Sequence, residues 1–84
     1  MYHSAIAGSN ATMSRAQQCF RLGMMCSTGQ ATALDLVSAH KWFNIAAIKG
    51  SARAAELRSE LSAAMSKVEI AKALREAREW MTMH

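Results

Sequence analysis

The sequence predicts an all-α protein of about four antiparallel helices arranged as two hairpins. The chain has 84 residues, of which 51% are hydrophobic, so we expect one small folded domain. Proline is absent and residues that favour strands are sparse, whereas Ala, Met, Leu, Glu, Lys and Arg, which favour helices, are abundant. The connections between the predicted helices are short, and helices joined by short loops pack as antiparallel neighbours.

The first predicted helix runs from about Arg15 to Thr28. Residues 1–13 before it are small and polar without an apolar period, and they predict a flexible tail. Ser14 is a suitable N-cap, and Gly29 suits the left-handed position that ends a helix. Gly23 in its middle is unexpected, because glycine there costs up to about 1 kcal/mol relative to alanine. We expect Gly23 to let a second helix approach where any Cβ atom would collide.

The second predicted helix runs from about Leu36 to Lys49. Asp35 before it is a good N-cap, and Gly50 after it is a stop signal. The apolar residues of this helix recur at a spacing of three to four and predict one buried stripe with Trp42 beside it. The stripe consists of Leu36, Ala39, Phe43, Ala46 and Ala47.

Two further helices are predicted in residues 51–84. The third runs from about Ala52 to Ala64 with Ser51 as its cap. The fourth runs from about Lys67 to Met81 and begins with the capping box Ser66-Lys67-Val68-Glu69. The residues predicted to point inward are Ala54, Leu57 and Leu61 in the third helix and Ile70, Leu74 and Ala77 in the fourth.

A set of residues spanning both helices of the first hairpin has a regular spacing. It reads Leu22-Gly23-x-Met25 … Gly29 … Asp35 … Ala39-x-x-Trp42-Phe43-x-x-Ala46-Ala47-x-x-Gly50 … Ala54. This pattern resembles a Sel-1-like repeat, a relative of the tetratricopeptide repeat, and Ala-x-x-Trp occurs again at Ala77–Trp80. The resemblance implies an α/α solenoid fragment with one full repeat at 14–50 and a partial, capping unit at 51–84. In that second unit Arg58 replaces the glycine, and we expect it to prevent close helix approach.

The resemblance also implies a function, because the leading helices of such solenoids line a concave surface that binds a peptide or protein. We therefore expect a non-enzymatic protein–protein interaction module, an adaptor or scaffold. Phe20, Met24 and Met25 cover more than one helix face, and methionine forms adaptable contact surfaces, although these side chains could also pack within the domain. By analogy the residues facing the partner are Gln17, Phe20, Met24, Ser27, Thr28, Ser59 and Ser62.

Catalysis has no support in the sequence. There is no glycine-rich phosphate loop, no His–Glu metal motif and no serine elbow, so we expect no enzymatic activity, no cofactor and no metal. Self-association into a homodimer is the alternative function. Nucleic-acid binding is less favoured despite the net charge of +4, because acidic and basic residues alternate in Arg53, Glu56, Arg58 and Glu60.

The sequence also predicts a cytoplasmic location. No apolar run approaches the roughly 18–20 residues of a membrane span, and the first residues lack the pattern of a secretory signal. Cys19 and Cys26 lie seven residues apart in one predicted helix, about 10 Å, which is too far for a disulfide. We therefore expect reduced thiols, no membrane span, and a protein or peptide partner.

Overall fold

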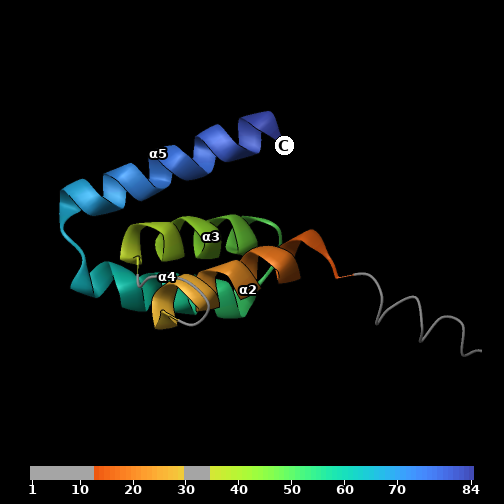
Figure 1. Cartoon of the computed structure of the whole chain (residues 1–84), viewed down its shortest axis with the longest axis horizontal. Helices are drawn as coiled ribbons and strands as arrows, with labels where there is room; N and C mark the ends of the chain where they lie inside the picture. Colours follow the sequence, from red (N-terminus) through yellow and green to blue (C-terminus); the bar gives the residue numbers. More distant parts are fainter. Residues whose placement is uncertain (1–12, 30–34) are drawn as a thin grey trace, which may run out of the picture.

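The computed structural model describes residues 13–29 and 35–84, and these residues form four α-helices and no strand (Figure 1). The all-α prediction is confirmed. Helix α2 spans Arg15–Thr28, α3 spans Leu36–Ile48, α4 spans Ala52–Ala64 and α5 spans Lys67–Met83. Helix α3 ends one residue earlier than predicted and α5 ends two residues later. The predicted flexible tail lies, except for Met13, outside the described residues.

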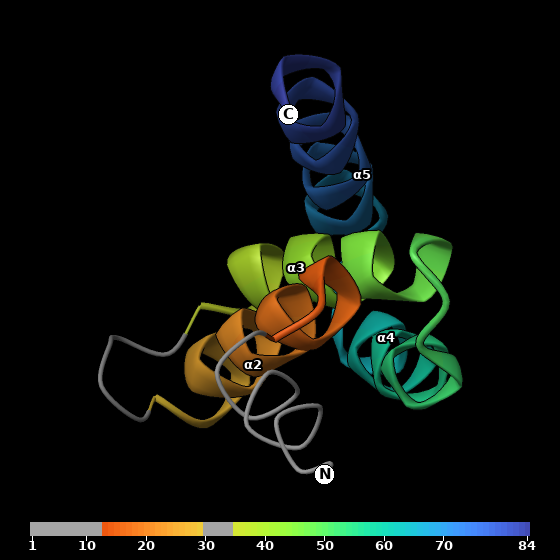
Figure 2. The ribbon, with the colours of Figure 1, turned by 90° about the vertical axis from the view of Figure 1, so that its right-hand side faces the viewer.

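Helix α3 is the centre of the molecule, because it packs against each of the other three helices. Consecutive helices run in opposite directions, so the leading helices α2 and α4 run the same way (Figure 1). Both lie on one side of α3, and α5 lies on the opposite side (Figure 2). The second hairpin is therefore open, since α5 rests on α3 and is separated from α4 by that helix.

Each helix begins directly after the residue that the sequence predicts as its N-cap. A capping side chain accepts a hydrogen bond from a backbone N–H that has no partner within the helix. Ser14 and Ser66 also form complete capping boxes with Gln17 and Glu69. The four N-caps are Ser14, Asp35, Ser51 and Ser66.

Small side chains dominate the core. The buried hydrophobic residues are Cys19, Ala39, Phe43, Ile45, Ala46, Ala54, Met65, Ala73 and Ala77. Helix α3 contributes four of these nine, more than any other helix, and it also buries His40 and Asn44, because helices cover it from both sides. Leu36 and Ala47 of the predicted stripe are only half-buried. Leu22, expected to be a structural residue of the repeat, is 37% exposed.

Candidate functional site

Helices α2 and α3 pack tightly at Gly23. A Cβ atom at this position would lie 2.7 Å from both Cδ1 and Cε1 of Phe43, well inside van der Waals contact. Phe43 is only 1% exposed, so its ring has little space into which it could move. The prediction that Gly23 allows a second helix to approach closely is confirmed.

Phe20 lies one helical turn before Gly23 and rests on the same buried ring. The centroids of the Phe20 and Phe43 rings are 5.7 Å apart and their planes are inclined at 57°, a favourable tilted arrangement. Phe43 is buried whereas Phe20 is half-buried. The close packing at Gly23 thus fixes the Phe43 ring beneath Phe20, whose side chain reaches the surface.

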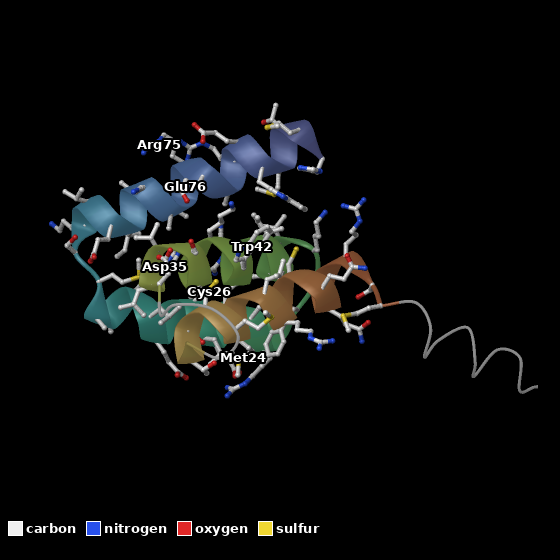
Figure 3. All side chains as sticks on the ribbon, in the orientation of Figure 1. Met24, Cys26, Asp35, Trp42, Arg75 and Glu76 are labelled. Atoms are coloured by element: carbon white, nitrogen blue, oxygen red, sulfur yellow. The ribbon has the colours of Figure 1, made fainter. Side chains whose placement is uncertain are left out.

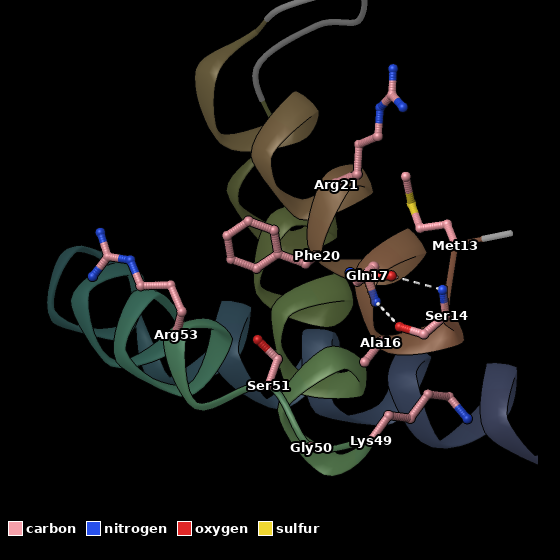
Figure 4. Close-up of a pocket in the computed structure, with 10 residues that line it drawn as sticks. All are labelled: Met13, Ser14, Ala16, Gln17, Phe20, Arg21, Lys49, Gly50, Ser51 and Arg53. Atoms are coloured by element: carbon pink, nitrogen blue, oxygen red, sulfur yellow. Dashed lines mark hydrogen bonds between the residues drawn. The ribbon is translucent and has the colours of Figure 1, made fainter. Parts of the chain in front are cut away.

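Phe20 faces an open groove of about 840 Å³ between the N-terminal half of α2 and the start of α4 (Figure 4). Three of the lining residues contribute apolar side chains, and three cationic side chains stand around them. None of the described residues that line the groove is acidic. The lining consists of Met13, Ser14, Ala16, Gln17, Phe20, Arg21, Lys49, Gly50, Ser51 and Arg53.

Two of the predicted partner-binding residues, Gln17 and Phe20, line this groove. The Gln17 side chain also has a local role, because its Oε1 accepts a hydrogen bond from the Ser14 backbone N at 2.9 Å. The other lining residues are not among the predicted partner-binding residues. Lys49, Gly50 and Ser51 form the turn between α3 and α4, and only folding brings this turn beside α2.

The other predicted residues of α2 lie further along the helix. Met24 is 37% exposed and lies on the lower side of the molecule in the view of Figure 3. The Ser27 and Thr28 hydroxyls both donate to the Met24 carbonyl oxygen, at 3.2 and 2.7 Å. These three residues do not line the groove described above.

The two predicted residues of α4 differ in exposure. Ser59 is exposed, and its hydroxyl donates to the Ala55 carbonyl oxygen at 3.2 Å. Ser62 is half-buried, and its hydroxyl donates to the Arg58 carbonyl oxygen at 3.0 Å and lies 2.9 Å from His40 Nε2. Because the Ser62 hydroxyl is engaged between α3 and α4, we leave Ser62 out of the candidate site.

The contact between α3 and α4 contains a buried polar cluster. The Ser62 hydroxyl uses its one hydrogen on Arg58, so His40 Nε2 is the donor to Ser62, and His40 Nδ1 has no hydrogen-bond partner among the described residues. Arg58 Nη1 donates to Asn44 Oδ1 at 2.7 Å. Burial, and secondarily the Arg58 charge, lowers the pKa of His40. Without a carboxylate on Nδ1 this serine and histidine lack the third group that orients a catalytic base.

The described part of the chain brings no three His, Cys, Asp or Glu side chains together as a metal site. Cys19 and Cys26 are free thiols. Burial raises the pKa of both, and the Asp35 carboxylate raises that of Cys26 further. A raised pKa keeps a thiol protonated and therefore unreactive.

Compared with known proteins, the chain matches no family model, no curated protein and no solved structure. The resemblance to Sel-1-like repeats therefore stays a prediction based on the residues of the chain alone. No helix within 13–29 and 35–84 is long and apolar enough to cross a membrane.

Proposed function

We propose that this protein is a non-enzymatic protein–protein interaction module, a small Sel-1-like adaptor or scaffold. In this proposal a peptide or a protein segment binds in the groove between α2 and α4. The observation that carries the proposal is Phe20, a half-buried aromatic ring on the groove surface that packs on the buried Phe43. Aromatic residues in well-packed positions supply a large share of the binding energy at protein interfaces.

The buried Phe43 ring beneath Phe20 favours binding because it reduces the entropic cost of ordering the Phe20 side chain on binding. Each side chain that becomes ordered at an interface costs about 0.5–1.5 kcal/mol. Phe43 lies against Gly23, and Phe20 lies against Phe43, so the Phe20 ring is positioned before a partner arrives. Ala16 beside it leaves space for a partner side chain.

The composition of the groove favours binding over catalysis. Its described lining includes no carboxylate, imidazole or thiol, the groups that most often act as general base or nucleophile. Its two serine hydroxyls already accept the capping hydrogen bonds of α2 and α4. The proposal includes a cytoplasmic location, which the two free thiols support.

The test is to fill the groove and measure peptide binding. Random twelve-residue peptides are selected by display against the wild-type protein, and the bound site is mapped by amide NMR shifts. We expect enriched peptides that shift groove residues such as Arg21 and Gly50 and that fail to bind Ala16→Trp. The matched control Ala71→Trp puts the same side chain on the exposed surface of α5 and should bind normally. A selection without enrichment, or peptides unaffected by Ala16→Trp, would overturn the proposed function.

A homodimer is the competing candidate, and one feature of α5 favours it. Although α5 packs on α3, its apolar residues Ile70, Leu74, Trp80 and Met81 stay half-exposed. Half-exposed apolar side chains along one helix are a surface that a second copy could cover. The solution mass separates the two candidates.

A further inference from the structure

The charges around the groove are all of one sign. Arg21, Lys49 and Arg53 contribute to its lining, and the described lining contains no acid to oppose them. Arg53 Nη1 pairs with Glu56 Oε1 at 2.9 Å, but both side chains are largely exposed, at 62% and 65%. Arg21 and Lys49 form no ion pair within the described part of the chain. The groove therefore combines an aromatic surface with cations that are available to a partner.

We infer that the groove binds an acidic peptide segment, and this inference rests on the proposed function. One apolar side chain of the peptide packs on Phe20 beside Ala16. Asp or Glu side chains on either side of it contact Arg21 and Lys49. Opposite charges across an interface fix the orientation of a partner and exclude partners of the wrong sign.

The carboxylates of the peptide meet side chains rather than backbone N–H groups. Ser14 Oγ accepts from Gln17 N at 3.0 Å, and Ser51 Oγ accepts from Ala54 N at 3.1 Å, so both helix starts beside the groove are capped from within. The cations are exposed, so added salt screens their attraction. Binding should therefore weaken with ionic strength while the apolar contact to Phe20 persists.

The layout of the cations favours a peptide over a nucleic acid. Arg21, Lys49 and Arg53 stand around one compact groove and extend in different directions (Figure 4). A nucleic-acid backbone needs a row of cations that follows its phosphates. Further along α4 such a row is interrupted, because Glu56 pairs with Arg53 and the Arg58 guanidinium is bonded to Asn44.

The test compares two charge reversals of equal size. The groove variant is Arg21→Glu/Lys49→Glu and the control is Arg75→Glu/Arg78→Glu on the exposed surface of α5, where Figure 3 places Arg75. Each lowers the net charge by four, from +4 to zero. All four positions are exposed, so both variants should fold, and circular dichroism is the measurement that checks this. The probe is the most enriched peptide of the display selection, labelled for fluorescence anisotropy.

We expect the enriched peptides to carry Asp or Glu on both sides of one large apolar residue. The dissociation constant should rise about tenfold or more in the groove variant, the size expected for loss of two interfacial charge contacts, and less than about twofold in the control. It should also rise in the wild type as salt is raised from about 50 to about 500 mM, where the Debye length falls to a few ångströms.

The contrary outcomes are distinct. Enriched peptides without acidic residues that still fail to bind Ala16→Trp overturn the inference and leave the proposed function standing. If both charge reversals weaken the binding of acidic peptides equally, the effect is one of general charge, and this outcome also overturns the inference. Binding of random-sequence duplex DNA or RNA that is lost in the groove variant, without enrichment of acidic peptides, assigns the surface to a nucleic acid. If the selection enriches no peptide, the proposed function itself is overturned.

Discussion

The absence of a side chain at position 23 decides how closely α2 and α3 pack. A glycine inside a helix is destabilising by up to about 1 kcal/mol relative to alanine, so helix propensity alone argues against it. The 2.7 Å separation between a Cβ atom at this position and the Phe43 ring supplies the opposing reason. Gly50 is favoured for a different reason, because its φ of 116° is strained for any residue with a side chain. Space is not the reason, since no atom would lie within 4 Å of a Cβ atom at this position.

Gly23→Ala should lower the free energy of unfolding by about 1 kcal/mol, because overpacking a core costs about 1–3 kcal/mol and exceeds the gain in helix propensity. Urea denaturation measures the change. In a Phe43→Leu background the same substitution should become neutral or stabilising. Gly50→Ala should destabilise both backgrounds equally, since its strain lies in the backbone. A Gly23→Ala protein more stable than wild type would contradict the role given to this contact.

At the scale of helices, α3 uses different chemistry on its two sides. Towards α4 it presents His40 and Asn44, which bond to Ser62 and Arg58. Towards α5 it presents Trp42, whose ring meets that of Trp80 edge-on with centroids 5.3 Å apart. Arg58, which the predicted alignment of the two hairpins matches to Gly23, donates a hydrogen bond from its guanidinium to Asn44 of α3. The second hairpin is open, with α5 resting on the opposite side of α3 from α4 (Figure 2).

The buried His40 should make stability depend on pH below about 6.5, the ordinary pKa of a histidine. Its pKa is lowered in the folded state, so the unfolded chain binds the proton first and stability falls as the pH falls. The slope from this one group is at most about 1.4 kcal/mol per pH unit. Tryptophan fluorescence in urea, repeated from pH 8 to pH 5, measures it.

Two histidine variants test whether His40 causes this pH dependence of stability. His40→Gln keeps a hydrogen-bond donor for Ser62 and should remove most of the slope between about pH 5 and 6.5. His84→Gln changes an exposed histidine that stacks on Trp80 and should retain the slope. The pKa of Asp35 is lowered, mainly by the backbone and side-chain hydrogen bonds from Ser38, so its contribution is lost only in more acidic solution. A slope unchanged in His40→Gln would contradict the role given to this residue.

The whole molecule is built around one helix, which leaves two outer surfaces with different characters. On one side α2, α4 and the turn between α3 and α4 enclose the groove with its cationic edge (Figure 4). On the other side α5 covers α3 (Figure 2). Part of the apolar side of α5 stays exposed. The proposed monomeric adaptor would use the first surface, whereas a homodimer would use the second.

As a monomeric adaptor the protein should keep a solution mass of 9.2 kDa as its concentration is raised. Light scattering after size exclusion measures this mass from micromolar to millimolar protein. A rise towards twice that value would support the homodimer instead. Leu74→Gln and Met81→Gln, which change half-buried residues on the apolar side of α5, would then locate the contact by restoring the lower mass.

The helices and their ends could be predicted because their causes are local. Ser14, Asp35, Ser51 and Ser66 act on N–H groups within a few residues of themselves, so the caps are readable from short stretches of sequence. The close helix contact at Gly23 could be predicted as well, because a glycine inside a helix needs a compensating contact. The partner of that contact could only be placed in the second helix as a whole, and the structure identifies it as Phe43.

Much of the groove could not be predicted, because its parts are remote in sequence. Arg21 and Lys49 are 28 positions apart and line one groove only because α2 and α3 pack antiparallel, which brings the end of α3 beside the first half of α2 (Figure 1). The burial of His40 likewise depends on α4 covering its side of α3. Periodicity along the chain therefore determines where helices form and which stripe is apolar. Contacts between side chains distant in the sequence decide how the helices stack. The stacking in turn decides which surfaces stay open, so these surfaces could not be predicted.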